Sequence, residues 1–475
     1  MNRLTELYQK KFGRTPDSII ALRSDGSDRK IYRVFSDDHS VIGILGSDRQ
    51  ENAAFLEFSK HFKKFGLRVP EIYIETPDAM AYLEEDFGDE MLFSWMVGIR
   101  EKHGFNKAIK KMYREVVEYL PLFQIKAGLS IDYSYCYQHL EFGVDSMHWD
   151  LHYFKRQFLN YFYKKKINHT ELEKDFSKLI KFLLQEDRKY FLYRDFQSRN
   201  IMIKDGLPHF IDYQSGRRGA LQYDLASLLY DAKANLPEDF REEMIDVYLN
   251  KARQMTRINP KRFRKYFYGF VLIRIMQAFG AYGYLSAVKG KTNFFKSVPF
   301  AIHNLETLLN KNIEILNQLP TLKEIFSNLI EDQYLREFQD KKKLVVRINS
   351  FGFHKTGIPP DTSGNNGGFV FDCRFLPNPG REEKYNAFTG KDNEVIKYFS
   401  QYKIVSDFLE HIFKIIDYTI DNYQSRSFSD LMISFGCTGG QHRSVYCAEK
   451  LADYLKKKGV TVKLNHLELE NAQKI

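Results

Sequence analysis

The sequence predicts an α+β protein with a sheet-rich N-terminal module, a mainly helical second module and a C-terminal module of alternating strands and helices. A chain of 475 residues is too long for one ordinary hydrophobic core. The apolar pattern changes from strand-like to helical near residue 90, and a charged stretch before residue 344 precedes a change of composition. We therefore expect four segments, 1–88, 89–320, 321–343 and 344–475, of which the third is a charged helical linker.

The N-terminal module is expected to be a small sheet with one helix. Residues 31–35 and 41–45 are strand-like runs on either side of a hairpin signal. An amphipathic helix follows at residues 51–66 and ends at a glycine. Two further strand-like runs, residues 69–75 and 79–85, complete the sheet.

The composition sets broad limits on function. Hydrophobic residues make up 43% of the chain and charged residues 28%, which indicates an ordinary globular protein. The net charge of +10 favours anionic ligands such as nucleotides, sugar phosphates or RNA without choosing among them. The four cysteines lack metal-ligand spacing, which predicts a reducing, cytoplasmic setting. Arg274 and Gln277 interrupt the apolar residues 266–285, so we expect a buried helix and no membrane segment.

The stretch from Tyr193 to Gln214 carries the strongest chemical signal. Asp195 is followed five residues later by Asn200, and a second aspartate, Asp212, follows a hairpin turn. A carboxylate and an amide oxygen beside phosphate oxygens are the hard ligands that Mg²⁺ takes, and Asp195 can accept the proton of an attacking hydroxyl. This spacing is typical of the catalytic loop and metal-binding strand of phosphoryl transfer. The alternative is a polar turn with an incidental aspartate and asparagine.

This part of the chain resembles the aminoglycoside phosphotransferase and choline kinase superfamily. Within it, the chain is most similar to the bacterial N-acetylmuramate and N-acetylglucosamine kinases, which phosphorylate an anomeric hydroxyl. The resemblance covers about residues 1–320 and implies a bilobal, protein-kinase-like fold. Five segments carry the resemblance: a phosphate-covering turn and strand (25–34), a hinge (83–89), the catalytic loop (194–200), the metal-binding strand (211–214) and a supporting helix (223–228).

The resemblance also implies cofactors and site residues. ATP would be the phosphoryl donor, Asp195 the base, and Asn200 and Asp212 the magnesium ligands. The nucleotide would lie against the turn and the hinge, at Gly26, Ser27, Arg29, Arg33, Glu84, Glu85 and Asp86.

Two departures from the superfamily pattern bear on activity. Tyr193 stands where such loops usually carry a histidine that supports the loop. The strand 41–45 has no lysine to hold the α- and β-phosphates. The anomeric sugar kinases also tend to lack this lysine, and Arg29, Lys30 and Arg33 could supply positive charge instead. A pseudokinase is the competing interpretation. No D-F-G or A-P-E element follows the loop, so we expect a sugar or amino-sugar hydroxyl as acceptor and not a protein.

A second chemical feature lies at residues 434–444, where a strand passes through glycines into a helix. Backbone N–H groups at the start of a helix, together with His442 and Arg443, are typical of an anion-binding turn. Two alternatives remain. One is a tight glycine turn with a structural arginine, and the other is a cysteine phosphatase, because Cys437, Arg443 and Ser444 have the C-x5-R-S spacing.

Residues 347–470 closely resemble the C-terminal domain of the RapZ family of RNase adaptor proteins, a domain that binds glucosamine-6-phosphate and takes part in small-RNA binding. The matching stretches are residues 350–353, 357–359, 371–379, 389–390 and 436–446. The resemblance implies that a phosphorylated amino sugar, as an effector, would lie against Thr438, Gly439, Gly440, His442 and Arg443. Charge is nearly balanced beyond residue 344, which makes RNA a less favoured partner.

Together these features predict a cytoplasmic, ATP- and magnesium-dependent kinase fused to a domain that senses an amino-sugar phosphate. The expected acceptor is an amino sugar such as N-acetylmuramate or N-acetylglucosamine, in the context of cell-wall recycling. The alternative is an RNA-binding or sugar-phosphate-responsive regulator with a vestigial kinase domain. The oligomeric state is not predicted.

Overall fold

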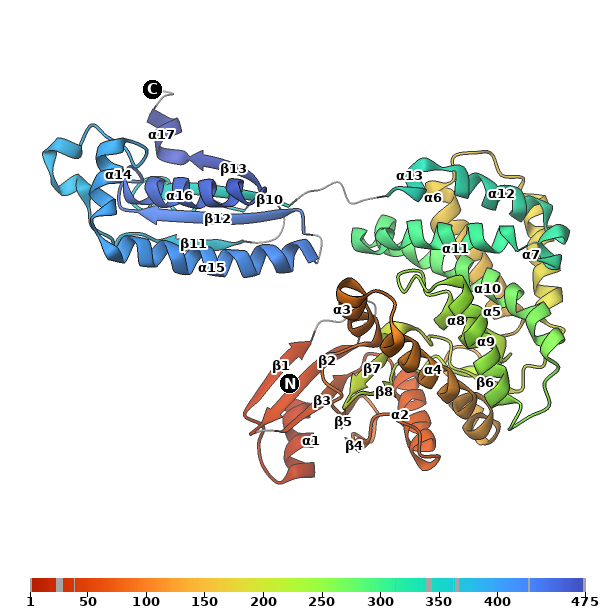
Figure 1. The fold of residues 1–475 in the computed structure, drawn as a ribbon. Coiled ribbons are helices and arrows are strands. Elements are labelled where there is room, and N and C mark those ends of the chain that lie inside the picture. Colours follow the sequence, from red (N-terminus) through yellow and green to blue (C-terminus); the bar gives the residue numbers. More distant parts are fainter. Residues whose placement is uncertain are drawn as a thin grey trace. The chain divides into compact units, whose positions relative to one another are not determined.

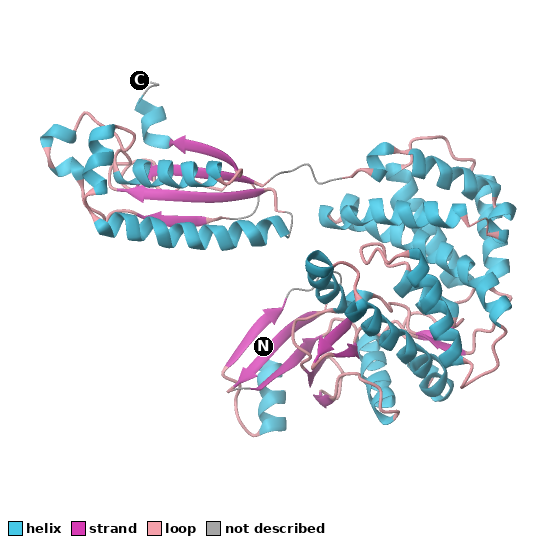
Figure 2. Cartoon of the chain, in the orientation of Figure 1, coloured by secondary structure: helices cyan, strands magenta, loops and turns pink. Residues whose placement is uncertain are grey.

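The computed structural model describes residues 2–22, 29–37, 39–311, 313–338, 344–361, 363, 367–425 and 428–472. The chain divides into two compact units, Met1–Phe338 and Gln339–Ile475, each with its own hydrophobic core. Figure 1 and Figure 2 show a sheet joined to a bundle of helices in the first unit, and strands packed with helices in the second. The protein is therefore α+β, and its first unit has two lobes, as the sequence predicts.

The first lobe is a five-stranded antiparallel sheet in the order β1-β2-β3-β5-β4. Because successive strand residues face opposite sides, Val41 and Leu83 pack with α1, whereas Ile44 and Tyr82 pack with α2. The elements are α1 (Asn2–Phe12), β1 (Ser18–Leu22), β2 (Lys30–Ser36), β3 (His39–Leu45), α2 (Arg49–Lys64), β4 (Ile72–Glu75) and β5 (Ala81–Glu85).

The second lobe is mainly helical and holds two short antiparallel strand pairs, β6 with β9 and β7 with β8. The turn between β7 and β8 consists of Asp205 and Gly206, both with positive φ (54° and 72°), which is the hairpin geometry that the sequence predicts there. The elements are α3 (Leu92–His103), α4 (Lys107–Pro121), α5 (Val144–Phe154), α6 (Asn160–Phe162), α7 (His169–Leu183), β6 (Tyr190–Leu192), β7 (Ile201–Lys204), β8 (Leu207–Phe210), β9 (Arg217–Gly219), α8 (Gln222–Leu229), α9 (Glu238–Ala252), α10 (Pro260–Gly283), α11 (Val298–Asn310), α12 (Pro320–Glu331) and α13 (Gln333–Arg336).

The helix α10 contains most of the apolar residues 266–285. With the turn that follows it, Pro260–Val288 is long and apolar enough to cross a membrane by length and composition, a criterion that core helices also meet. In the structure α10 packs against α5, α8 and α11 and buries Phe267, Phe270 and Phe279. Its place is therefore in the core of the helical lobe.

The helices α12 and α13 extend the first unit past residue 320. The sequence predicts a linker from residue 321, but Leu322, Ile325, Phe326 and Leu329 lie in the core of this unit. These residues recur every three or four positions, so they form one apolar face of α12. The first unit consequently ends at Phe338.

The second unit is a four-stranded parallel sheet in the order β11-β12-β10-β13. Parallel strands need crossover connections, and helices supply two of them. The helices α15 and α16 pack side by side, with the rings of Phe413 and Tyr454 stacked at 4.2 Å. The elements are β10 (Val345–Gly352), β11 (Phe369–Asp372), α14 (Asn393–Ser400), α15 (Lys403–Ser425), β12 (Asp430–Cys437), α16 (Arg443–Lys457), β13 (Thr461–His466) and α17 (Leu467–Ala472).

Candidate active site

The catalytic loop follows β6 and is positioned by the buried carboxylate of Asp224 in the first turn of α8. This carboxylate accepts hydrogen bonds from the backbone N–H groups of Tyr193 at 2.8 Å and Arg194 at 2.9 Å. It also accepts one from Gln124 Nε2 at 2.9 Å. Burial raises the pKa of Asp224 to about 6, although these donors oppose the rise. The supporting helix therefore fixes the backbone immediately before Asp195.

Arg194 anchors the same loop through its side chain. The guanidinium makes a two-point ion pair with the fully buried Asp150 of α5, at 2.9 and 2.6 Å, and donates to the Tyr223 hydroxyl at 2.5 Å. The backbone φ of Arg194 is +80°, a region that few non-glycine residues adopt. Such strain persists where surrounding contacts over-determine the conformation, and it is concentrated at functional sites.

Tyr193 supports the loop in the place of the missing histidine. Its hydroxyl donates to the backbone carbonyl of Ile211 at 2.6 Å. This bond ties the start of the catalytic loop to the segment that carries Asp212. The departure from the superfamily pattern therefore leaves the loop supported.

Asn200 brings the three predicted residues together. Its Nδ2 donates to the backbone carbonyl of Asp195 and to Oδ2 of Asp212, each at 2.9 Å. The other carboxylate oxygen of Asp212 accepts from Arg29 at 3.1 Å and from Gln214 at 2.9 Å. Asp212, like Arg194, has a positive φ, +70°. The hairpin thus directs Asn200 and Asp212 to one point, as the sequence predicts.

The electrostatic setting of Asp195 suits a proton acceptor. Burial and the neighbouring Asp212 charge raise the pKa of Asp195. Three guanidiniums, those of Arg194, Arg274 and Arg217, oppose the rise. A carboxylate with a raised pKa is a stronger base than an ordinary aspartate, and Asp195 remains partly exposed.

An arginine just before β2 supplies a positive charge that β3 lacks. Arg29 is 8% exposed and lies between Asp212, at 3.1 Å, and Glu51 of α2, at 3.5 Å. Asp48 caps α2 by accepting the Glu51 N–H at 3.1 Å, which fixes the first turn of that helix. Sequence reasoning missed Glu51. A general rule could have indicated Glu51, because kinases pair a glutamate on a helix with the lysine of a strand.

The predicted nucleotide-binding turn is only partly described, since Gly26 and Ser27 lie outside the described residues. Arg33 on β2 makes ion pairs with Asp86 at 2.6 Å and with Asp89 at 2.9 Å. Arg33 is therefore committed to the hinge and ties it to the sheet.

The other hinge side chains also make structural contacts. Glu85 pairs with Lys204 of β7 at 3.1 Å and so joins the sheet to the catalytic hairpin. Glu84 points into the interior, where burial raises its pKa to about 8. A nucleotide at this hinge would consequently meet backbone groups, which is the mode of adenine binding that the resemblance implies.

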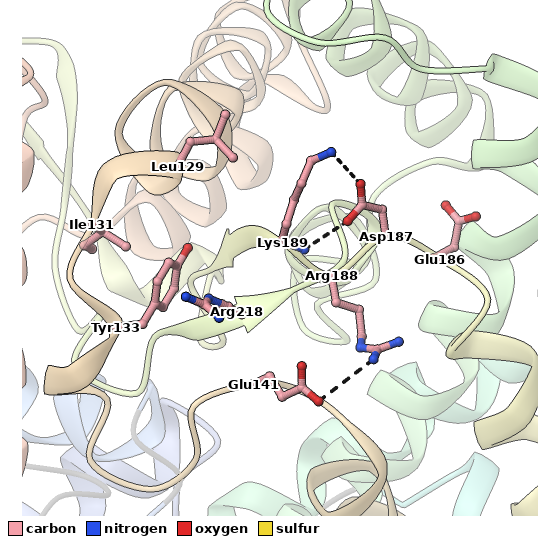
Figure 3. A pocket seen from close by; sticks show the side chains of 9 residues that line it. All are labelled: Leu129, Ile131, Tyr133, Glu141, Glu186, Asp187, Arg188, Lys189 and Arg218. Carbon is pink, nitrogen blue, oxygen red and sulfur yellow. Dashed lines mark hydrogen bonds and ion pairs between the residues drawn. The ribbon is translucent and has the colours of Figure 1, made fainter.

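A cavity of about 600 Å³ lies beside β9 and the segment 186–189 that leads into β6. Figure 3 shows Arg218 and Tyr133 in its lining, facing residues 186–189. Successive strand residues point to opposite faces, so Arg218 lines this cavity while Arg217 turns to Ser146 of α5, at 3.5 Å. None of the predicted site residues lines it.

The predicted anion-binding turn joins β12 to α16 in the second unit. Gly440 has φ +71°, and a Cβ there would lie 2.8 Å from the backbone nitrogen of Gly352, so the position requires glycine. A Cβ at Gly439 would meet no described atom within 4 Å, so the turn is open at that residue.

Arg443 and His442 of this turn bond to backbone carbonyls of another segment of the unit. Arg443, 6% exposed, donates to the carbonyl of Arg374 at 2.6 Å and to Thr438 Oγ1 at 3.2 Å. His442 Nε2 lies 3.1 Å from the carbonyl of Tyr385. The predicted residues are therefore together, and both cationic side chains take part in building the turn.

The thiol of Cys437 is 3% exposed and belongs to the core of the second unit. Its Sγ lies 3.1 Å from Ser444 Oγ. A thiolate nucleophile needs access to its substrate as well as a positive environment. This placement suits a packed core residue better than a phosphatase nucleophile.

Comparison with known protein families identifies both units. The family model of the phosphotransferase enzyme family matches residues 19–260, half of the chain. That of the RapZ C-terminal domain matches residues 344–470. The chain belongs to the phosphotransferase enzyme family and carries a C-terminal domain of the RapZ type.

Individual relatives match only part of the chain. Nucleotide-binding proteins of Pseudothermotoga lettingae and Thermotoga neapolitana are 36% and 45% identical over 159 and 125 residues, which are 32% and 26% of this chain and 55% and 42% of theirs. The chain thus spans about half the length of the curated relatives it matches. A choline kinase structure from Cryptosporidium parvum is similar with a TM-score of 0.46 and 13% identity, over 68% of this chain and 99% of that chain.

Proposed function

We propose that the first unit transfers the γ-phosphoryl group of ATP, with Mg²⁺, to a hydroxyl of an amino sugar such as N-acetylmuramate or N-acetylglucosamine. The observation that carries the proposal is the amide of Asn200, which holds Asp195 and Asp212 in one cluster. A base and two metal ligands so placed are what phosphoryl transfer requires. Membership of the phosphotransferase family supports the reaction class.

Asn200 and Asp212 suit a magnesium ion. Both bonds of the Asn200 amide come from its nitrogen, so Oδ1 is available as a hard ligand. Asp212 is 36% exposed, and its Oδ2 accepts one hydrogen bond from the described residues. Gln214 Oε1 is buried without a hydrogen-bond partner among the described residues, and a cation or its water would satisfy it. Bound there, Mg²⁺ would neutralise charge on the phosphates.

Asp195 orients the acceptor hydroxyl and takes its proton. As the acceptor oxygen forms its bond to the γ-phosphorus, the bond from that phosphorus to the bridging oxygen of ADP breaks, and the proton moves to the Asp195 carboxylate. The raised pKa of Asp195 makes the carboxylate a better acceptor of that proton.

Arg29 would hold the nucleotide phosphates in place of a strand lysine. It is tied to Glu51 in the way that kinases tie their lysine to a helix glutamate, and it reaches the metal-binding aspartate. A guanidinium also matches phosphate oxygens in a two-point geometry that a lysine cannot make.

The second unit would bind a phosphorylated amino sugar, as product or effector. The match to the RapZ C-terminal domain and the open turn at Gly439 support this assignment. Cell-wall recycling in the cytoplasm is the setting in which these two activities belong together.

The test of the catalytic half is ATP-dependent phosphorylation of N-acetylmuramate and N-acetylglucosamine, with products identified by NMR. Asp195→Asn should lower kcat by a factor of about 100 or more, because it removes general-base catalysis. Asp205→Asn, in the β7–β8 turn of the same hairpin, is the matched control and should retain full turnover. Equal turnover by wild type and Asp195→Asn would contradict the assignment of the base.

A second candidate is an RNA-binding or sugar-phosphate-responsive regulator with a vestigial kinase domain. The absence of a lysine from β3 favours it. This candidate predicts no phosphorylated product and RNA affinity that falls steeply with salt. Product formation by the wild-type protein excludes a vestigial kinase.

A further inference from the structure

We infer that the acceptor of this kinase carries an anionic group, a carboxylate or a phosphate, and that Arg217 and Arg274 bind it. The inference rests on the proposed function, since it assigns a ligand to the site beside Asp195. It defines the acceptor more narrowly than an amino sugar in general.

The first of these arginines lies beside Arg194 along α5. Arg194 is bound to Asp150, and Arg217 Nη1 lies 3.5 Å from Ser146, four residues earlier on the same helix. Residues four apart are neighbours on one helix face. Arg217 therefore lies next to the arginine that precedes Asp195.

The second arginine is placed near Arg194 through α8. Arg194 donates to Tyr223, and Arg274 Nε donates at 2.9 Å to Ser227, four residues later on that helix. Arg217 from β9 and Arg274 from α10 therefore both lie near Arg194. All three guanidiniums influence the pKa of Asp195.

Arg217 is buried without a counter-ion. It is 3% exposed and donates to neutral oxygens, namely the carbonyl of Ser215 and Oε1 of Gln138, each at 3.0 Å. No carboxylate of the described residues lies within ion-pair distance of it. Burial and the neighbouring Arg194 charge lower its pKa to about 10. A buried charge that lacks a partner is costly, which indicates that a ligand supplies one.

Arg274 also has neutral partners. Besides Ser227, it donates through Nη1 to Gln277 Oε1 at 2.6 Å. Its Nη2 makes no hydrogen bond within the described part of the chain, and the residue is half-buried. A guanidinium with a remaining donor edge can bind a carboxylate or phosphate.

The acidic groups near this site have other partners. Asp150 is paired with Arg194, Asp212 with Arg29, and Asp231 accepts from Ser198 Oγ at 2.5 Å. Arg217 and Arg274 thus lie near Arg194, the residue before Asp195, and neither makes an ion pair with a described carboxylate. A cationic acceptor would be repelled there, whereas an anionic one would be attracted.

The experiment compares three acceptors with the full-length protein, ATP and Mg²⁺. N-acetylglucosamine is neutral, N-acetylmuramate adds a carboxylate, and N-acetylglucosamine-6-phosphate adds a phosphate. We expect wild type to have a kcat/KM at least about tenfold higher for one of the anionic acceptors, which identifies the anion. Arg217→Met should raise KM for that acceptor about tenfold or more, leave KM for ATP within about twofold, and lower kcat/KM for the anionic acceptor by a clearly larger factor than for N-acetylglucosamine.

Two further variants make the result decisive. Arg274→Met should reproduce the acceptor-specific loss and carries the test if Arg217→Met does not fold. Arg218→Met, on the opposite face of β9, should leave all constants unchanged.

The inference would be overturned if wild type preferred N-acetylglucosamine, or if the arginine variants lost kcat/KM equally on neutral and anionic acceptors. Either result would leave the kinase assignment intact. Absence of any product from wild type with all three acceptors would overturn the proposed function and the inference with it.

Discussion

The catalytic cluster of the first unit and the anion-binding turn of the second both use a buried arginine, yet they are built in different ways. The loop that carries Asp195 is held by residues from distant elements, Asp150 of α5 and Asp224 of α8. The turn is held instead through backbone carbonyls of another segment, because Arg443 donates to the carbonyl of Arg374 and His442 lies against the carbonyl of Tyr385. The first site therefore depends on buried carboxylate side chains, and the second on the backbone of the segment from residue 374 to residue 385.

The largest expected effect is on the long-range support of the catalytic loop. Arg194→Met leaves Asp150 buried without its partner, which should cost about 3–5 kcal/mol in the free energy of unfolding. Urea unfolding of the full chain, followed through the transition of the first unit, measures this. Arg188→Met, which breaks the weaker Arg188–Glu141 contact at 3.9 Å, should cost less than about 1 kcal/mol. Similar losses of unfolding free energy in both variants would show that the Arg194–Asp150 ion pair stabilises the lobe no more than the Arg188–Glu141 contact does.

The anion-binding turn should respond to a single substitution in a residue proposed to bind the ligand. Arg443→Ala should weaken binding of glucosamine-6-phosphate about tenfold or more, because a charge-assisted contact is lost. Isothermal titration calorimetry of the full chain checks this prediction. Arg374→Ala is the control, since Arg443 donates to the backbone carbonyl of Arg374, which this substitution retains. No binding by the wild-type protein would rule out a sugar-phosphate site at this turn.

The pH dependence of turnover tests how the catalytic cluster is charged. The base must be deprotonated, so kcat should fall about tenfold per pH unit below the pKa of Asp195. Burial raises that pKa, which places the fall at higher pH than for an exposed aspartate. Removal of a guanidinium that opposes the rise, in Arg274→Met, should move the fall to still higher pH. A shift to lower pH in this variant would contradict the proximity of Arg274 and Asp195.

The smallest effect is expected at Cys437. If the turn recognises a phosphate without cleaving it, Cys437→Ser should change phosphate release from p-nitrophenyl phosphate by less than about twofold. A cysteine phosphatase would lose that activity almost completely, because the thiolate is its nucleophile. Retained binding of glucosamine-6-phosphate would show that the variant is folded.

The spacing of the site residues along the chain explains which of them could be predicted from sequence. Asp195, Asn200 and Asp212 fall within a short contiguous motif, and so do the residues of the turn. Arg217 and Arg274 could not be predicted as a pair, because β9 and α10 bring them together without a shared spacing. The double arginine after Gly216 was the only local sign.

The fold was predictable to a similar degree. Local signals predict the strands β2 to β5 of the first lobe, the β7–β8 turn and the α/β alternation after residue 344. The boundary at residue 320 was expected from charge, whereas Leu322, Ile325 and Leu329 carry a helical apolar period that extends the core to Phe338.

The strand β9 has a consequence for how acceptor preference could change. A shift of one residue in its pairing with β6 would exchange Arg217 with Arg218, since each step along a strand reverses the face. Two glycines oppose such a slip, because a Cβ at Gly216 or Gly219 would come within 2.2 or 2.3 Å of Phe191 or Leu192. The register of the three residue pairs between β6 and β9 therefore decides which arginine side chain points toward α5 and which lines the cavity that Arg218 now lines. A one-residue insertion there could invert substrate preference without altering any catalytic residue.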